Sequence, residues 1–210
     1  MLILSDVTKR YGKRTILNGV TAEFPQGICL IEGPSGAGKS TLLRLCATVE
    51  SPNSGNLAWD GKPMRSQRGR FRRGLGYAPQ AVSLPLNLTG REFLHHMAAL
   101  KGGGGAIRAQ ADHYLEGVGL GETANTPILA YSGGMKRRLI LCQALLGAPH
   151  LLALDEPTAE LDSKTATRMV ELISEAAKTA VVLVTTHLAE PFRAAGARAF
   201  AFADGQVHTR

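Results

Sequence analysis

A chain of 210 residues is long enough for one large domain with a sizeable core, and its formal net charge of +7 favours anionic partners such as a nucleotide, a nucleic acid or a membrane surface. Its three cysteines, Cys29, Cys46 and Cys142, lie in apolar stretches, which indicates reduced core thiols and argues against a disulfide framework or a metal centre. The first residues turn polar too early for a signal peptide, and no apolar run reaches the roughly 20 residues of a membrane span, so we expect a soluble cytosolic chain.

The first third of the chain has the pattern of strands arranged around one helix. Apolar residues alternate with polar ones, or run together where a strand is buried, and turn residues separate these runs. We therefore expect a helix over 39–48 and strands over 2–7, 15–24, 27–32, 56–61 and 75–78.

The most informative motif lies between the strand at 27–32 and the helix that follows it, where the sequence reads Gly33-x-x-x-x-Gly38-Lys39-Ser40. Glycines at 33, 36 and 38 let main-chain N–H groups turn inward at close range, and the helix offers its N-terminal dipole to an anion. In such a loop the lysine reaches the β- and γ-phosphates and the serine hydroxyl binds Mg²⁺. The segment therefore predicts a nucleotide-binding loop.

From about residue 81 the apolar spacing becomes that of helices, and after Pro149 strands and helices alternate again. The pattern predicts an α/β fold in a single domain, with a core of about 1–80 and 148–210 and a helical lobe of about 81–147. The expected elements are helices over 89–101, 107–118, 135–146, 163–177 and 190–195, strands over 150–155 and 179–186, and a closing hairpin around 204–205.

A second chemical centre follows the apolar run LLAL, where Asp155 and Glu156 precede a proline. Ligands bind at the carboxyl ends of buried parallel strands. Because successive strand residues point to opposite sides, we expect different tasks, with Asp155 holding Mg²⁺ and Glu156 polarising the attacking water. His187 ends the next apolar run, so a neighbouring strand would place it where it can donate to a γ-phosphate oxygen. We expect His95 and His96, by contrast, to be solvated helix residues.

A second potential anion site stands about 90 residues after the first, where Ser132, Gly133 and Gly134 precede a predicted helix. Serine is a common N-cap, and the two glycines leave main-chain amides open at the helix start. In isolation this is an ordinary capped helix. Two phosphate sites for one nucleotide suggest that two copies of the chain face each other.

Taken in order, these motifs resemble those of the ATP-binding subunit of ABC transporters over nearly the whole chain. The resemblance implies a P-loop NTPase core with a mainly parallel sheet, an N-terminal antiparallel β subdomain and an inserted α-helical lobe. Tyr11 matches the aromatic residue that stacks on adenine, Gln80 the Q-loop glutamine, and Asp162 the D-loop aspartate. The Walker A loop corresponds to Gly33, Pro34, Ser35, Gly36, Ala37, Gly38, Lys39, Ser40 and Thr41.

The same resemblance implies ATP and Mg²⁺ as cofactors. Two domains pack head to tail, as a homodimer or as a heterodimer with a similar subunit, and each ATP lies between the Walker A loop of one copy and the signature of the other. The family also implies a separate integral membrane subunit and a peripheral position on the cytoplasmic face of the cell membrane, with no nucleic-acid partner. The implied residues are Ser40, Gln80 and Asp155 for the metal, Glu156 and His187 for catalysis, and Ser132, Gly133 and Gly134 for the signature.

Two motifs depart from the commonest forms of the family. The signature reads YSGGM instead of LSGGQ, and the D-loop reads AELD instead of SALD. The serine and both glycines that meet the phosphate are intact, so we expect altered tuning of an active site. The segment after the Q-loop and the YSGGM signature resemble the exporter branch, which includes drug, polysaccharide and antibiotic-peptide pumps, and the short chain also resembles the small haem-exporter ATPase.

Two other functions stay open from the residues alone: a soluble ABC ATPase acting on nucleic acid or ribosomes, and a non-catalytic regulator that binds ATP. The short distance between the two phosphate sites leaves no room for a coiled coil, and intact Glu156 and His187 oppose the regulator. A basic cluster before the Q-loop is either a solvated face or a contact with the membrane partner or anionic headgroups. Its members are Arg65, Arg68, Arg70, Arg72 and Arg73.

Overall fold

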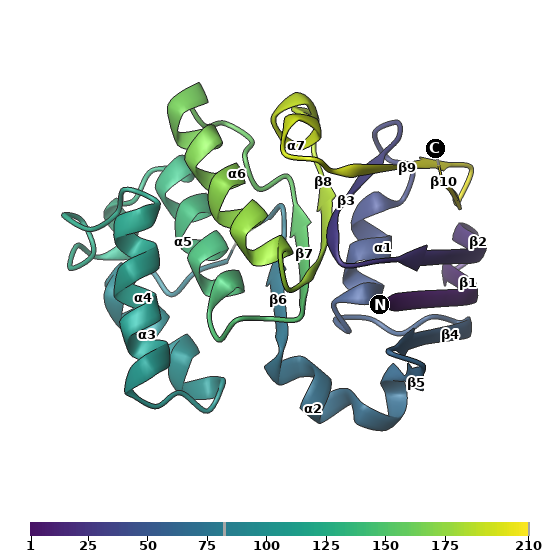
Figure 1. The fold of residues 1–210 in the computed structure, drawn as a ribbon, viewed down its shortest axis with the longest axis horizontal. Helices are drawn as coiled ribbons and strands as arrows, with labels where there is room; N and C mark the ends of the chain where they lie inside the picture. Colours follow the sequence, from purple (N-terminus) through teal and green to yellow (C-terminus); the bar gives the residue numbers. More distant parts are fainter. Residues whose placement is uncertain (82, 210) are drawn as a thin grey trace.

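The fold combines two β-sheets with helices on both faces of the larger one (Figure 1). The computed structural model describes residues 1–81 and 83–209. The strands are β1 (Leu2–Tyr11), β2 (Arg14–Phe24), β3 (Gly27–Glu32), β4 (Ser54–Trp59), β5 (Lys62–Pro63), β6 (Leu75–Ala78), β7 (Leu151–Asp155), β8 (Val181–Thr185), β9 (Arg198–Ala203) and β10 (Gln206–Thr209). The helices are α1 (Lys39–Cys46), α2 (Arg68–Arg73), α3 (Gly90–Leu100), α4 (Gly105–Gly117), α5 (Gly133–Leu145), α6 (Ser163–Ala177) and α7 (Glu190–Ala194), with 3₁₀ turns η1 (Met64–Gln67) and η2 (Ile128–Ala130).

The larger sheet has the strand order β10-β9-β3-β8-β7-β6, and only the pair β9–β10 within it is antiparallel. Every residue of β7 and β8 is buried. Successive side chains of β3 enter opposite layers: Ile28 and Leu30 join the core formed with α5 and α6, whereas Cys29 and Ile31 join the core formed with α1 and the N-terminal strands. A mainly parallel sheet covered on both faces confirms the predicted α/β class.

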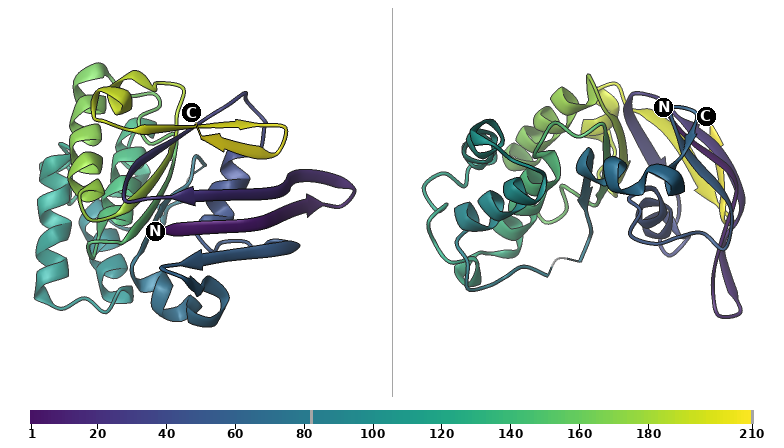
Figure 2. Two further views of the ribbon diagram at one scale, coloured as in Figure 1. Left: turned by 45° about the vertical axis from the view of Figure 1, so that its right-hand side comes forward. Right: turned by 90° about the horizontal axis from the view of Figure 1, so that it is seen from below.

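The two cores occupy different sides of this sheet. In Figure 1, α3, α4 and α5 lie together on one side, and α1 lies on the other side with β1, β2, β4 and β5. Seen from below, in the right panel of Figure 2, the helices and the N-terminal strands form two arms that diverge from the parallel strands. Among the residues that the structure describes, no helix combines the length and apolar character needed to cross a membrane.

The N-terminal sheet is antiparallel, with the order β2-β1-β4-β5. Strand β1 extends beyond the predicted end at residue 7 and reaches Tyr11. The register shifts between Leu4 and Val7, where Asp6 has a φ of 52°, and the successive residues Val7 and Thr8 are then both buried. A simple period of two therefore ends at this bulge although the strand continues.

Helix α2 lies in the basic cluster, where the sequence pattern predicts no helix. Among its residues with described side chains only Phe71 is buried, so the helix has no apolar face that the pattern could reveal. Arg68 and Arg72 each donate to the Thr48 carbonyl oxygen at 2.8 Å, and Arg72 Nε also donates to the Thr48 hydroxyl at 3.0 Å. Thr48 has a φ of 54°, which is unusual for a β-branched residue. Two arginines of the cluster therefore hold the strained end of α1, while the side chain of Arg70 lies outside what the structure describes.

The paired histidines of α3 differ in their surroundings. His96 is exposed, as expected. The expectation of a solvated residue was wrong for His95, which is half-buried with its Nε2 3.8 Å from Asp112 of α4. Arg91, one turn earlier on the same helix face, places its Nε 3.0 Å from the same carboxylate. The face of α3 that carries Arg91 and His95 therefore packs against α4. The positions of the two adjacent histidines in the sequence do not indicate which of them lies on this face.

We expect the three cysteines to be unreactive in the folded protein. All three are free and buried, and burial raises the pKa of Cys29 and Cys46 to about 12 and raises that of Cys142 as well. A thiol assay at pH 8 should detect no reactive group before unfolding and three after unfolding in guanidinium. A thiol that reacts rapidly in the native protein would contradict the packing of its strand or helix.

Candidate functional site

The carboxyl ends of β3, β7 and β8 meet at one edge of the large sheet and border a pocket of about 320 Å³. Strand β8 lies between β3 and β7, so the segments that follow these three strands are neighbours. Polar residues from segments far apart in the sequence therefore share one pocket. The residues that line it are Tyr11, Arg14, Ile16, Ser35, Gly36, Gly38, Lys39, Ser40, Thr41, Gln80, Asp155, Glu156 and His187.

The loop between β3 and α1 passes so close to other strands that glycine is required at two positions. A Cβ atom on Gly33 would lie 2.0 Å from the Phe202 carbonyl oxygen, and one on Gly38, which has a φ of 113°, would lie 2.6 Å from Ile16. Gly38 caps α1 without a side-chain hydrogen bond, so the first amides of the helix are open to the pocket. Lys39 Nζ donates to the carbonyl oxygens of Gly33 at 2.7 Å and Pro34 at 2.9 Å. The loop thus presents backbone donors and one ammonium group to an anion.

A second pocket of about 540 Å³ adjoins the same loop on the side of β2 and the β9–β10 turn. Pro34 and Ala37, which the resemblance assigns to the Walker A loop, line this pocket, and Ser35, Gly36 and Arg14 line both. The loop therefore has a pocket on either side.

Asp155 and Glu156 both line the main pocket, although we expected successive strand residues to point to opposite sides. Strand β7 ends at Asp155, and Glu156 has a φ of 53°, so the alternation of an extended strand stops between them. Both residues are buried, with 6% and 7% of their surface exposed. The Thr185 hydroxyl donates to Asp155 Oδ1 at 2.6 Å, which partly satisfies this buried carboxylate.

His187 lies beside Glu156, as its place after β8 predicts. The His187 backbone N–H donates to Glu156 Oε2 at 3.2 Å, and the imidazole Nε2 lies 3.5 Å from Glu156 Oε1. Arg137 of α5 donates to the Glu156 carbonyl oxygen at 2.9 Å. The backbone and the side chain of Glu156 are therefore held separately, while the largely exposed imidazole of His187 remains accessible to a ligand.

Arg14 and Ile16 also line the pocket, and sequence reasoning missed both. Arg14 is the β-sheet partner of Tyr11 across the β1–β2 hairpin. Its side chain forms no hydrogen bond or ion pair within the part of the chain that the structure describes, so it adds a cation beside Lys39. The dipeptide Tyr11–Gly12 is typical of a turn, and a turn here could have indicated that residue 14 faces residue 11.

Seven predicted binding residues do not line this pocket: Gly33, Pro34 and Ala37 of the phosphate loop, and Ser132, Gly133, Gly134 and Asp162 at the starts of α5 and α6. Ser132 caps α5 by accepting from the Met135 amide at 3.2 Å, and Asp162 caps α6 by accepting from the Thr165 amide at 2.9 Å. These two caps are close together, since a Cβ atom on Gly134 would lie 3.1 Å from Leu161. Within one chain, the structure thus separates the second anion site from the first.

Tyr131, the unusual residue of the signature, is buried and anchored in the helical region. Its hydroxyl donates to the Thr123 carbonyl oxygen at 2.8 Å. A Cβ atom on Gly90, the first residue of α3, would lie 2.4 Å from the Tyr131 hydroxyl oxygen. The large side chain before Ser132 is therefore accommodated by a glycine on another helix.

Comparisons with known proteins give a consistent result. A family model described as ABC transporter matches residues 17–159. The linearmycin resistance ATP-binding protein LnrL of Bacillus subtilis (strain 168) is 33% identical over 193 residues, which cover 90% of this chain and 62% of that protein. The Nod factor export ATP-binding protein I of Burkholderia orbicola is 37% identical over 188 residues, with 88% and 62% covered. The chain thus spans about three fifths of the length of these relatives.

Solved structures share the whole fold. The dimeric structure of MJ0796, a bacterial ABC transporter cassette, matches with a TM-score of 0.90 and 29% identity, and the match covers 99% of this chain and 97% of the other. A post-hydrolysis dimer of the same cassette, bound to ADP and Pi, matches with a TM-score of 0.89, 28% identity and the same coverage.

The contact between Gly90 and Tyr131 makes a testable prediction about stability. Gly90→Ala should destabilise the protein by about 1–3 kcal/mol, because the added methyl group overpacks against the Tyr131 hydroxyl. In a Tyr131→Leu background the same change should be neutral or stabilising, since alanine is the better helix former. Urea unfolding of the four proteins measures both effects. An equal loss in both backgrounds would show that the strain at Gly90 has another source.

Proposed function

The chain belongs to the ABC transporter family, and on this basis we propose that it is the ATP-binding and ATP-hydrolysing subunit of a transporter, powering the passage of a substrate across a membrane together with a separate integral membrane subunit. The names of the two relatives, one a resistance and one an export ATP-binding protein, support export as the direction. One observation carries the proposal: the glycine loop, the buried carboxylate pair and His187 share one pocket.

In the proposed complex the nucleotide lies along this pocket from Tyr11 to Glu156. The Tyr11 ring receives the adenine, and the residues 33–41 surround the phosphates, with Lys39 turning from its present carbonyl partners to the β- and γ-phosphates. Arg14 supplies a second cation on the same side of the pocket. The ammonium and guanidinium groups then offset the charge of the triphosphate.

The residues proposed for Mg²⁺ are Ser40, Gln80 and Asp155, and all three line the pocket. Their oxygen donors suit a hard cation. Asp155 is a buried carboxylate with one hydrogen bond and no ion pair among the described residues, so a cation would also compensate its charge. Within that part of the chain no three acidic, histidine or cysteine side chains form a metal cluster. When bound, Mg²⁺ neutralises charge that develops on the phosphates.

Glu156 is the proposed general base. Its carboxylate is held at the pocket wall by the His187 amide, where it can orient water and accept its proton during attack on the γ-phosphate. The exposed His187 imidazole is free to turn towards a γ-phosphate oxygen and to report whether that phosphate is present.

A second copy completes the site in this proposal. Ser132, Gly133 and Gly134 form the open N-terminus of α5, and Asp162 stands beside them, but all four lie outside the pocket of their own chain. A head-to-tail dimer, with an identical or a similar subunit, would bring them to the ATP of the partner. The dimeric form of the cassette with 29% identity supports this arrangement.

We further propose a peripheral position on the cytoplasmic face of the cell membrane, reached through the membrane partner. The division into a nucleotide-binding core of about 1–80 and 148–210 and a helical lobe of about 81–147 belongs to the same proposal, since the lobe helices are inserted between β6 and β7. In this proposal the basic cluster contacts the membrane partner or anionic headgroups and not a nucleic acid, because both relatives are named for resistance or export.

The proposed chemistry is tested by separating binding from hydrolysis. Glu156→Gln keeps the size of the side chain but loses the base, so hydrolysis should fall by about 10²–10⁴ with little change in ATP affinity. Lys39→Ala should instead weaken ATP binding by roughly tenfold to a hundredfold, since it removes charge-assisted hydrogen bonds to phosphate. Calorimetry and a phosphate-release assay give both readouts. Unchanged turnover in Glu156→Gln would refute the role of this carboxylate.

The shared site is tested by light scattering. Glu156→Gln should form dimers with ATP and Mg²⁺ but not with ADP, because the γ-phosphate bridges the copies. Adding Ser132→Arg should abolish dimers and spare ATP binding by the monomer, since the cation occupies the start of α5 where phosphate docks. If the double variant dimerises as well as the single one, the head-to-tail arrangement is wrong.

A further inference from the structure

Glu50 is the centre of a polar network that connects Tyr11 with helix α1. Its carboxylate accepts a hydrogen bond from the Tyr11 hydroxyl and another from Arg44 Nε at 2.7 Å. Lys9 Nζ lies 3.0 Å from the same carboxylate. None of the motifs found in the sequence includes Glu50, Arg44 or Lys9, yet all three lie beside the aromatic ring that borders the nucleotide pocket.

The way α1 ends explains why Glu50 reaches this place. The Thr48 amide donates to the Leu45 carbonyl oxygen at 3.0 Å and the Val49 amide to that of Arg44 at 2.9 Å, which is the Schellman pattern of a helix end. The chain then turns back along α1, and the Glu50 amide also donates to the Arg44 carbonyl oxygen, at 3.3 Å. The backbone and the side chain of Glu50 therefore both form hydrogen bonds with Arg44.

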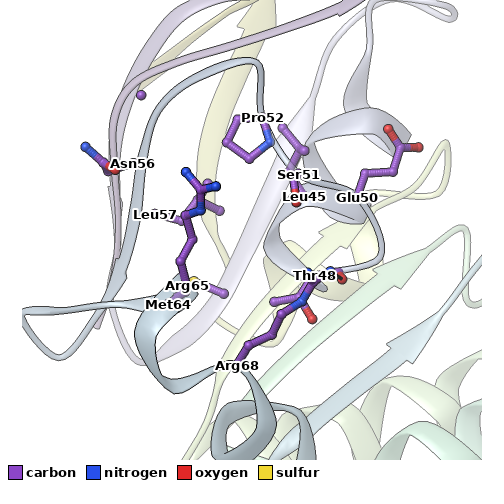
Figure 3. A pocket seen from close by; sticks show the side chains of 11 residues that line it. Leu45, Thr48, Glu50, Ser51, Pro52, Asn56, Leu57, Met64, Arg65 and Arg68 are labelled. Carbon is purple, nitrogen blue, oxygen red and sulfur yellow. Dashed lines mark hydrogen bonds between the residues drawn. The ribbon is translucent and has the colours of Figure 1, made fainter.

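Figure 3 shows that the Glu50 side chain extends away from the nearby Arg65 and Arg68. No ion pair joins Glu50 to either of these arginines within the described residues, although all three line one small pocket. Arg68 donates instead to the Thr48 carbonyl oxygen. The charge of Glu50 is thus directed to the network around Tyr11 and not to the basic cluster.

Arg44 links the two ends of the nucleotide pocket. Its Nη2 donates to the Tyr11 hydroxyl oxygen at 3.2 Å and to the Thr41 hydroxyl at 3.0 Å. Thr41 is buried in the first turn of α1, directly after the phosphate loop. One guanidinium therefore spans the distance between the aromatic ring and the loop.

The Tyr11 ring is left with one face for a ligand. The residue is 43% exposed, so packing alone does not fix its orientation. Lys9 Nζ lies over one face, 5.0 Å from the ring centroid. The hydroxyl is held by Glu50 and Arg44, and the uncovered face remains for a flat group to stack on.

The ionised state of the network is maintained by its own contacts. Burial alone raises the pKa of Glu50, but hydrogen bonds from Tyr11, Lys9 and Arg44 outweigh this effect and lower it overall. Burial alone lowers the pKa of Arg44, and the hydrogen bonds to Tyr11 and Glu50 outweigh that effect and raise it. Glu50 and Arg44 thus stabilise each other as an ion pair.

We propose that Glu50, acting with Arg44 and Lys9, is a positioning residue that fixes the Tyr11 ring as a stacking platform for a purine base at a set distance from the phosphate loop. The inference rests on the proposed nucleotide site and names the residues that orient its base. A platform ordered before binding loses little conformational freedom when the base arrives. The network therefore contributes to the base part of the affinity and not to the phosphate part.

The test compares the affinities of Mg²⁺–ADP and Mg²⁺–pyrophosphate by calorimetry. Glu50→Gln should raise the Kd of ADP about fivefold, equivalent to about 1 kcal/mol, and leave that of pyrophosphate unchanged. Tyr11→Phe, which keeps the ring and loses the hydroxyl, should have the same effect. The double variant should be no weaker than either single one, because both changes remove the same anchor. Glu23→Gln, at an exposed position of β2, is the matched control and should change neither affinity.

The outcomes separate this inference from the function on which it depends. A wild-type protein that binds neither probe overturns both. If wild type binds both probes and Glu50→Gln leaves the ADP affinity unchanged, or weakens ADP and pyrophosphate equally, the positioning role is overturned and the nucleotide site stands. Should Glu50→Gln fail to fold, Tyr11→Phe decides the question alone: it must weaken ADP and spare pyrophosphate.

Discussion

The burial of β3, β7 and β8 on both faces is the constraint on which the rest of the structure depends. A strand covered on both sides accommodates an unpaired polar group only at great cost, so polar side chains gather where the strands end. Asp155 shows the limit: it is the last residue of β7, and the hydroxyl of Thr185 on the neighbouring strand satisfies one of its oxygens. Because the strands are parallel, these ends meet at one edge, and a single pocket contains the chemistry of segments far apart in the chain.

This constraint also explains what the amino-acid sequence can predict. Lys39, Asp155 and His187 each follow an apolar run that marks a buried strand, so their convergence follows from the pattern and from the rule for parallel sheets. Arg14 and Ile16 enter the pocket through two contacts, the pairing of β1 with β2 and the approach of β2 to the phosphate loop. The turn at residues 11–12 indicates the first contact, but no local pattern encodes the second.

Backbone conformation limits prediction in a different way. The positive φ of Glu156 places two successive carboxylates in the same pocket, where strand alternation predicts opposite sides. Helix α2 lacks an apolar stripe, and its arginines form contacts with the end of α1 that depend on tertiary structure. The space for Tyr131, the unusual residue of the signature, is likewise provided by Gly90, which lies far from it in the sequence. Local patterns thus identified most of the elements and most of the site, while α2, Arg14 and Ile16 depend on long-range contacts.

Helix α1 is held at its two ends. Its first residue, Lys39, closes the phosphate loop, and the carbonyl group of Thr48 just beyond its last turn is clamped by two guanidinium groups of α2. Eight residues of helix measure about 12 Å, so the two ends of α1 are close together. The phosphate loop and the arginines of α2 therefore contact opposite ends of the same short helix, so the position of α1 is fixed from both sides.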